Sequence, residues 1–449
     1  MELSWCLVTS QGVGLQQSNL FVTLVRGAGA ALTIQVVSAA IIYGTQVLLA
    51  RWMGTAAYGI YNYAIAIGIF WAFIAGLGLP TAVLRFISAY KAQQDWAHLQ
   101  GMIWGSWWQT LIIGILTALG GTGILLWIHA AYSLGPYTTP LLIGIWTVPA
   151  VALMALQKEI IRAFQQIVLS YGPSQIVQPL LLIGLGLLWQ IWHELTSTVA
   201  IALSLIAAVF TLAMQWLLFQ QQLDITIRRT RPAYELAKWW KVALPMVLFG
   251  GSHMVLSQTD TLMIGVFLDA RQVGIYGAAL KTSLWVPFIL ASVNAISAPL
   301  IAALYARGDH QQLQQLVSTI ARWMFYPALV TALGLTVFAV PVLKLFGPEF
   351  VVARGVLIIL MVGQLVNVGA GSVGYLLTMT GHQTQSAMVM GVSALVNVIL
   401  NLVGIRLFGL VGAAVATTFS MVIWNIWLYV LVVRYLNVRP SILDALNGH

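Results

Sequence analysis

The sequence predicts an all-α polytopic membrane protein, with about 12 transmembrane helices in two six-helix lobes around a central cavity. Three observations predict this fold. The composition is too apolar for a soluble protein, apolar stretches of membrane-spanning length recur along the chain, and the second half echoes the first. Hydrophobic residues make up 60% of the 449 residues and charged residues only 7%. Soluble domains carry about 25% charged residues, so a water-covered exterior is excluded.

Each predicted span is an apolar window of about 20 residues, the length that a helix needs to cross the hydrocarbon core of a bilayer. The windows lie at 27–49, 60–84, 102–128, 140–162, 173–192, 197–219, 242–267, 277–302, 317–342, 355–379, 384–407 and 410–433. The longest connection, 220–241, lies at the midpoint and is the one loop of soluble composition.

The position of this loop divides the chain into three parts. We expect an N-terminal lobe at 1–222, a cytoplasmic linker at 223–241 and a C-terminal lobe at 242–449. Residues 1–19 lack a basic segment, so we predict a short extension there and not a cleaved signal peptide.

The placement of Lys and Arg predicts that both termini face the cytoplasm, because basic residues favour that side of a membrane. With this orientation, fourteen of the 20 basic residues lie on the inner side. The remaining six are Arg51, Arg271, Lys281, Lys344, Arg354 and Arg406. An even number of spans follows from the same placement.

A short sequence echo relates the two halves. Tyr58-Gly59-Ile60-Tyr61 follows the first span, and Val273-Gly274-Ile275-Tyr276 follows the seventh, 215 positions later. With six spans in each half, equivalent loops fall on the same side of the membrane. Parallel halves of this kind are typical of transporters that alternate access to a central site.

Asp260 is the clearest charge inside a span, and such charges usually mark a function or a buried partner. His253, Ser257 and Asp260 are spaced i, i+4, i+7, so they share one helix face. One interpretation is a substrate contact or a coupling site, with Asp260 and His253 binding a proton or cation. The other is a structural ion pair of Asp260 with a basic residue such as Lys281. The sequence leaves both open.

A second charged cluster, Lys158, Glu159 and Arg162, lies at the inner end of the fourth span, with Arg85 on the same side. Two cations four residues apart repel each other unless an anion lies between them or Glu159 screens Arg162. Arginine favours bidentate contact with phosphate. We predict a cationic cavity for a phosphate-bearing substrate, formed by Arg85, Lys158, Arg162 and Lys281. Ordinary inner-side residues that reach lipid headgroups are the alternative.

Amide side chains recur in the spans of the second half. Gln364 and Asn367 lie three residues apart, and Asn397 and Asn401 lie four apart, so each pair occupies one helix face. Cavity lining and interhelical hydrogen bonding are both open for these amides. The residues that we assign to the polar lining of the cavity are Asn294, Gln364, Asn367 and Asn397.

Several functional classes are excluded by what the sequence lacks. A single cysteine, Cys6, excludes an intrachain disulfide and a cysteine-based metal site, and no metal or cofactor is predicted. No Gly-x4-Gly-Lys-Ser/Thr motif occurs, so this chain does not hydrolyse ATP. Basic residues are spread between apolar runs, which argues against nucleic acid as a partner. The outer loops are too short for a catalytic site, so we predict a protein that is not an enzyme. A membrane glycosyltransferase is the rival class.

Five segments, in this order and spacing, resemble the bacterial polysaccharide and O-antigen flippases of the Wzx type. These belong to the multidrug/oligosaccharidyl-lipid/polysaccharide exporter superfamily. The segments are LARWMGTAAYGIY at 49–61, GLGLPTA at 76–82, DTLMIG at 260–265, FGPEF at 346–350 and GLVGAAVA at 409–416. The match covers nearly the whole chain. One departure is Asp260, where the family often has a basic residue.

The resemblance implies an alternating-access transporter of the bacterial inner (plasma) membrane without ATPase activity. Its substrate would be an oligosaccharide on undecaprenyl diphosphate, moved from the inner to the outer leaflet for surface polysaccharide such as lipopolysaccharide. Coupling to an H⁺ or Na⁺ gradient is open. The expected partners are membrane lipids and the polysaccharide polymerase and ligase machinery. The alternatives are a cation-coupled multidrug or metabolite exporter and a peptidoglycan lipid-precursor flippase of the same superfamily.

Overall fold

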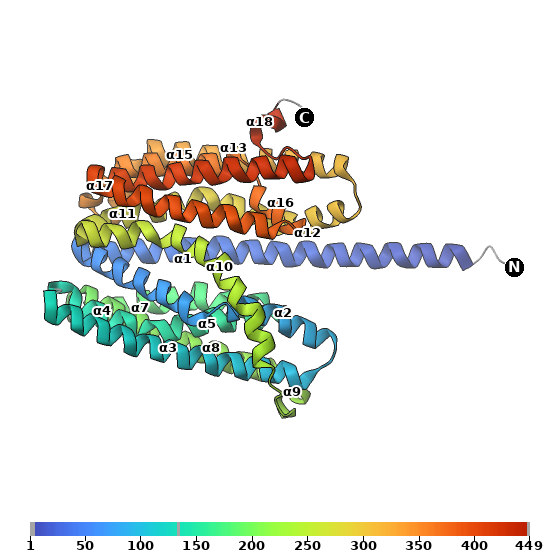
Figure 1. Cartoon of the computed structure of the whole chain (residues 1–449), viewed down its shortest axis with the longest axis horizontal. Helices are drawn as coiled ribbons and strands as arrows, with labels where there is room; N and C mark the ends of the chain where they lie inside the picture. Colours follow the sequence, from blue (N-terminus) through green and yellow to red (C-terminus); the bar gives the residue numbers. More distant parts are fainter. Residues whose placement is uncertain (1–4, 133–134, 447–449) are drawn as a thin grey trace.

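The protein is a bundle of long, roughly parallel helices (Figure 1). The computed structural model describes residues 5–132 and 135–446, and every regular element within these ranges is helical. The predicted fold class is therefore confirmed. The prediction for residues 1–19 falls partly outside the described residues.

The N-terminal half contains eight α-helices and two short helices of other types. They are α1 (Trp5–Gly76), α2 (Leu79–Ala92), α3 (Trp96–Tyr132), the 3-10 helix η1 (Gly135–Tyr137), α4 (Thr138–Ile145), α5 (Thr147–Ala163), α6 (Ile167–Gly172), the π-helix η2 (Pro173–Val177), α7 (Gln178–Gln190) and α8 (Ser197–Gln222). The short helix α9 (Ile225–Arg229) lies in the connection at the midpoint.

The C-terminal half repeats this helical pattern. Its elements are α10 (Leu236–Phe267), α11 (Ala270–Ser283), α12 (Trp285–Ala306), α13 (His310–Val337), α14 (Ala339–Phe346), the 3-10 helix η3 (Pro348–Ala353), α15 (Arg354–Gly369), α16 (Val373–Met379), α17 (Gln383–Leu436) and α18 (Ile442–Leu446).

Two helices, α1 and α17, are too long to cross a membrane once, because 72 and 54 residues exceed the roughly 20 that one crossing needs. Each reverses at one glycine with positive φ, 74° at Gly54 and 58° at Gly409 (Figure 1). The two arms of α17 pack backbone to backbone next to the reversal at Gly409. A Cβ on Gly412 would lie 1.8 Å from the carbonyl oxygen of Gly404. Each helix is therefore a transmembrane hairpin.

Counting both arms of these hairpins gives the predicted number of crossings. Within the described ranges, eight helical segments are long and apolar enough to span a membrane, and the bent pair α11–α12 makes a ninth. Two of the eight are the hairpins, which add two crossings, and α10 supplies the last. The described ranges thus hold twelve helical segments for crossing a membrane, the number that the sequence predicts.

The crossings form two lobes, with α1–α8 in one and α11–α17 in the other (Figure 1). Helix α10 belongs to both. Its first turns lie in the N-terminal core, where Trp239 and Ala243 are fully buried with Leu79 and Leu99. Its later turns pack against α17.

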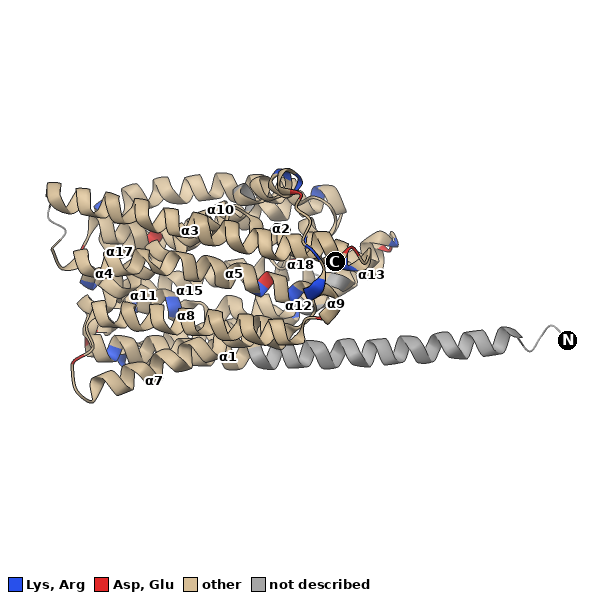
Figure 2. Cartoon of the chain, turned by 90° about the horizontal axis from the view of Figure 1, so that it is seen from below, with Lys and Arg blue, Asp and Glu red and all other residues tan. Residues whose placement is uncertain are grey.

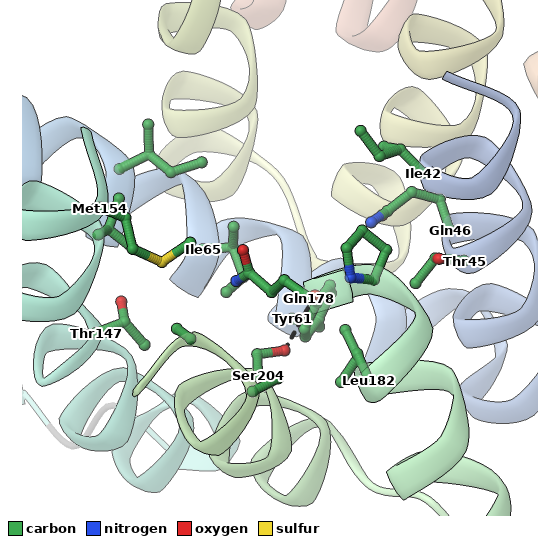
Figure 3. A pocket seen from close by; sticks show the side chains of 15 residues that line it. Ile42, Thr45, Gln46, Tyr61, Ile65, Thr147, Met154, Gln178, Leu182 and Ser204 are labelled. Carbon is green, nitrogen blue, oxygen red and sulfur yellow. Dashed lines mark hydrogen bonds between the residues drawn. The ribbon is translucent and has the colours of Figure 1, made fainter. Parts of the chain in front are cut away.

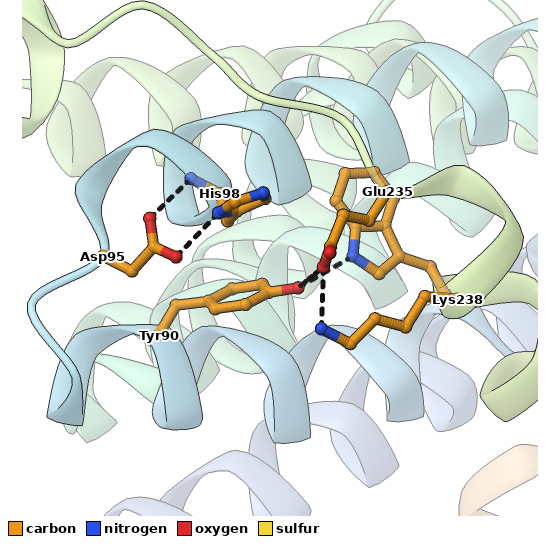
Figure 4. A network of polar contacts seen from close by, with 6 residues as sticks. Tyr90, Asp95, His98, Glu235 and Lys238 are labelled. Atoms are coloured by element: carbon orange, nitrogen blue, oxygen red, sulfur yellow. Dashed lines mark hydrogen bonds and ion pairs between the residues drawn. The ribbon is translucent and has the colours of Figure 1, made fainter.

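The connection that precedes α10 is fastened to α2 and α3 by polar contacts (Figure 4). Tyr90 donates to Glu235 at 2.9 Å and accepts from the Trp239 indole at 3.2 Å. Lys238 and Tyr90 both donate to the carboxylate of Glu235 and hold its pKa below the ordinary value. The carbonyl of Ala97 accepts from the amide of Ala233 at 2.9 Å. These bonds fix where the C-terminal half of the chain begins.

At the opposite end of the bundle, the lobes meet at the two glycines that the sequence echo pairs. A Cβ on Gly59 would lie 1.6 Å from the carbonyl oxygen of Ala270, and one on Gly274 would lie 2.2 Å from that of Thr55. Thr55 and Ala270 are themselves 215 positions apart, so the contact is reciprocal. We call these four residues the glycine contact. A side chain at either glycine would prevent the two backbones from meeting.

Candidate functional site

The larger cavity of the bundle, about 640 Å³, lies between α1 and the C-terminal lobe. Charged groups are otherwise concentrated toward the two ends of the molecule, with few along its middle (Figure 2). Most of the residues that the sequence assigned to a cavity line this one. They are His253, Asp260, Lys281, Asn294, Gln364 and Asn367. These side chains come from four helices that are distant in sequence.

Lys281 is the basic residue of this cavity, and its hydrogen-bond partners all lie in the facing lobe. Its ammonium donates to Gln46, to Asn62 at 2.5 Å and to the Tyr58 hydroxyl at 3.3 Å. All three partners are in α1. Among the described residues no carboxylate oxygen lies within 4.0 Å of this ammonium. The proposed ion pair of Asp260 with Lys281 is therefore wrong.

Asp260 is instead surrounded by neutral donors. Its carboxylate accepts from Tyr276, from Thr417 at 2.6 Å and from the Asn401 amide at 3.0 Å. The residue is 3% exposed. No cation pairs with this carboxylate in the part of the chain that the structure describes, and a buried acidic group inside a membrane bundle is a candidate site for a proton or a small cation.

Asn397 does not line the cavity, in contrast to the other assigned amides. Its side-chain oxygen accepts from Asn401 at 3.2 Å, and its amide donates weakly to Thr417 and Ser420. Asn397 thus orients two of the groups that contact Asp260. It acts on the cavity only through them.

A smaller cavity of about 300 Å³ lies within the N-terminal lobe (Figure 3). No charged residue lines it, and its polar contacts include a 3.3 Å hydrogen bond between Tyr61 and Ser204. It shares Gln46, Ile65 and Ile69 with the larger cavity, so the α1 hairpin separates the two.

The inner cationic cluster lies outside both cavities. Glu159 screens it, with an oxygen 2.9 Å from Arg162 and another 3.7 Å from Lys158. Arg162 also donates to Tyr171 at 3.3 Å. Arg85 is exposed on α2 and lines neither cavity. The structure thus brings Lys281 together with the cavity amides but does not bring Arg85, Lys158 and Arg162 to them.

The position of Lys158 and Arg162 on α5 still relates them to the smaller cavity. Thr147, Val151 and Met154 line that cavity at spacings of four and three, and Lys158 and Arg162 continue the same stripe toward the inner end. Two cations share one carboxylate there, which leaves one positive charge in excess.

We expect the double variant Lys158→Ala, Arg162→Ala to lower transport several-fold without lowering the amount of protein. Both side chains are more than a third exposed, so their ion pairs contribute little to stability. The measurement is the transport rate normalised to protein in isolated membranes. Undiminished transport by the double variant would remove the anion site from this end of α5.

The sequence missed the α1 residues that complete the Lys281 environment. Gln46 and Asn62 are amides within otherwise apolar stretches, and Tyr58 belongs to the sequence echo. Their polar side chains inside or beside apolar spans could have identified them as candidate cavity residues. Tyr276, which contacts Asp260, also belongs to the sequence echo. Thr417 carries no such signal, because isolated hydroxyls are common in membrane helices.

Two lobes of six crossings with a polar cavity between them are the architecture of a membrane transporter. Comparisons with solved structures agree on this fold. The inward-facing conformation of a multidrug resistance MATE family transporter of the MOP superfamily has a TM-score of 0.71 at 15% identity, covering 90% of this chain and 98% of that one. The lipid II flippase MurJ has a TM-score of 0.70 at 16% identity, covering 92% and 89%.

The sequence comparisons identify the family. Residues 24–305 match the family described as polysaccharide biosynthesis protein, and residues 245–403 match the MatE family. The chain therefore belongs to the polysaccharide biosynthesis protein family, within the exporter superfamily that the sequence motifs predicted.

Curated relatives match shorter parts of the chain. A probable low-salt glycan biosynthesis flippase, Agl15 of Haloferax volcanii, is 28% identical over 168 residues, 37% of this chain and 36% of the relative. EpsK of Bacillus subtilis, an uncharacterized membrane protein, is 25% identical over 241 residues, 53% of this chain and 46% of the relative. The alignments thus span less than half the length of these relatives.

Proposed function

We propose that this protein is a flippase that moves an oligosaccharide on undecaprenyl diphosphate from the inner to the outer leaflet of the bacterial plasma membrane. Membership of the polysaccharide biosynthesis family and the similarity to a probable glycan flippase support this proposal. No step of the proposal requires ATP or a covalent reaction. The polymerase and ligase that act on surface polysaccharide would use its product.

The observation that carries the proposal is Lys281, a cation on the wall of the larger cavity with no carboxylate partner among the described residues. Burying a cation in a membrane protein is costly unless it is paired. A diphosphate is the substrate group that would supply the missing negative charge. The Nδ2 atom of Asn62 is buried and has no hydrogen-bond partner among the residues that the structure describes, so a second donor lies beside the ammonium.

The same lysine would connect substrate binding to movement of the lobes. In the structure its hydrogen bonds run from α11 to α1 and join the two lobes. A phosphate oxygen that accepts from Lys281 would replace these partners, because it carries a negative charge that the neutral amide and hydroxyl oxygens lack. The loss of these three hydrogen bonds between the lobes would then favour separation of the lobes near Lys281.

Transport in proteoliposomes tests the proposed function directly. Purified protein is reconstituted with undecaprenyl diphosphate oligosaccharide, and exposure of the glycan on the opposite leaflet is followed with an impermeant lectin. We expect a rate that depends on the protein and is absent from empty vesicles. Failure to flip this lipid, together with export of cationic drugs by the same vesicles, would favour the exporter alternative.

We further propose that Asp260 binds the coupling cation, either H⁺ or Na⁺. Asp260→Asn keeps the shape of the side chain but removes its charge. We expect the variant to flip the lipid-linked glycan equally fast with and without an imposed gradient, whereas the unmodified protein is accelerated by one of the two gradients. Vesicles with separate pH and Na⁺ gradients make this measurement. A variant that still responds to the gradient would exclude Asp260 as the coupling site.

A further inference from the structure

We infer that the C-terminal-lobe wall of the larger cavity recognises the hydroxyl groups of the sugar, separately from the diphosphate at Lys281. This inference rests on the proposed function and adds a subsite to it. We call this surface the amide wall. It consists of Asn294 of α12, Gln364 and Asn367 of α15, Tyr375 of α16, and Trp424 and Asn425 of α17.

Gln364 is the most informative residue of the amide wall. It is 3% exposed, it lines the cavity, and its Oε1 atom has no hydrogen-bond partner in the part of the chain that the structure describes. A buried acceptor without a donor is unfavourable, so a ligand that donates to it would be favoured. An ionised phosphate has only acceptors and cannot do so. A sugar hydroxyl can.

The neighbouring amides are held by hydrogen bonds in one orientation. Asn425 donates to the side-chain oxygen of Asn367 at 3.0 Å, and Ser372 donates to that of Asn294 at 2.5 Å. Because these oxygens already accept, Asn367 and Asn294 present their amide nitrogens as donors. The wall therefore combines donors with the acceptor of Gln364. A pyranose, whose hydroxyls both donate and accept, matches this combination.

The remaining members of the wall suit a neutral sugar rather than an ion. None of the six residues is charged, and Tyr375 and Trp424 add aromatic surface to the cavity. Binding sites for neutral organic ligands commonly combine apolar and aromatic walls with a few well-placed polar groups. The C–H groups on one side of a pyranose ring can pack against such aromatic faces. Lys281 and Asp260 lie on the same cavity but on α11 and α10.

The test compares two lipids that differ only in the sugar. Binding of undecaprenyl diphosphate, and of the same lipid carrying its oligosaccharide, is measured on the full-length protein in detergent by tryptophan fluorescence. We expect Gln364→Leu to weaken binding of the glycosylated lipid by about 5- to 10-fold, the effect of one neutral hydrogen bond. Binding of the sugar-free lipid should stay unchanged, which also shows that the variant is folded.

Two further variants separate this inference from the proposed function. Gln315→Leu makes the same chemical change on the exposed face of α13 and should leave both affinities unchanged. Lys281→Met should weaken both lipids. If Gln364→Leu weakens both lipids equally, or neither, the amide wall does not recognise sugar. If the unmodified protein fails to bind the sugar-free lipid, or Lys281→Met binds it normally, the diphosphate site of the proposed function fails instead.

Discussion

Replacing Lys281 by Met should nearly abolish transport while leaving the protein folded. The ammonium is the one positive charge on the wall of the larger cavity among the described residues, and a hydrogen bond to a charged group contributes about 1.5–3 kcal/mol, or roughly 10- to 150-fold in affinity. Met keeps much of the length of the side chain. Removing the ammonium also removes the cost of burying a charge, which offsets the loss of its hydrogen bonds to Gln46 and Asn62.

The measurements for Lys281→Met are the flipping rate in proteoliposomes and the midpoint of thermal unfolding. Lys281→Arg keeps the charge and should retain a measurable part of the rate, which identifies the charge as the relevant property. A Met variant that unfolds at the normal temperature and flips lipid at the normal rate would contradict the role of Lys281. A fall in the unfolding midpoint by itself would show that the bonds to Gln46 and Asn62 are structural.

Adding a methyl group at the glycine contact should lower transport by a similar factor, through separation of the lobes and not through loss of a charge. In Gly59→Ala the new Cβ would lie 1.6 Å from the carbonyl oxygen of Ala270, and backbone atoms cannot yield as a flexible side chain can. The helices must therefore separate where the two lobes meet. We expect transport to fall more than tenfold, because the lobes can no longer close at this end.

The separation can be measured independently of transport. Thr55 belongs to the glycine contact and is 4% exposed, so Thr55→Cys in a Cys6→Ser background should react slowly with an impermeant maleimide. Addition of Gly59→Ala should accelerate the reaction. Gly44→Ala is a matched control in the same helix, since nothing lies within 4 Å of its Cβ position. Maleimide labelling at the same rate with and without Gly59→Ala, together with normal transport, would show that the glycine contact is not needed for closure of the lobes.

Much of the fold could be predicted from the sequence because hydrophobic length alone defines a membrane crossing. The break between the predicted spans 384–407 and 410–433 coincides with the reversal of α17 at Gly409. Apart from that residue, α17 is helical throughout. Breaks inside crossings were not predicted at particular residues. The predicted span 277–302 is divided near Leu284, where α11 ends and α12 begins, and Pro287 marks this break because it has no amide hydrogen to donate to the carbonyl of Ser283.

The candidate site was only partly predictable, because side-chain contacts depend on packing between distant segments. Asp260 and Gln364 could be found as polar residues inside apolar spans. Lys281 was counted on the outer side by its place along the chain and was also assigned to a cationic cavity, but hydropathy could not separate it from Arg85, Lys158 and Arg162, which line neither cavity. Glu159 illustrates the opposite case, because the neighbouring cations in its own helix turn already suggested the ion pairs that the structure contains.

The membership of α10 in both lobes has a mechanical consequence. Its N-terminal turns are buried with one lobe around Trp239, and its C-terminal half packs with the other, so the two lobes cannot move apart as separate rigid bodies. Any rocking motion must bend this helix. Pro245 lies just after the buried turns and lacks the amide hydrogen that would stiffen the helix there. Bending of α10 at Pro245 would therefore determine how the two lobes move relative to each other.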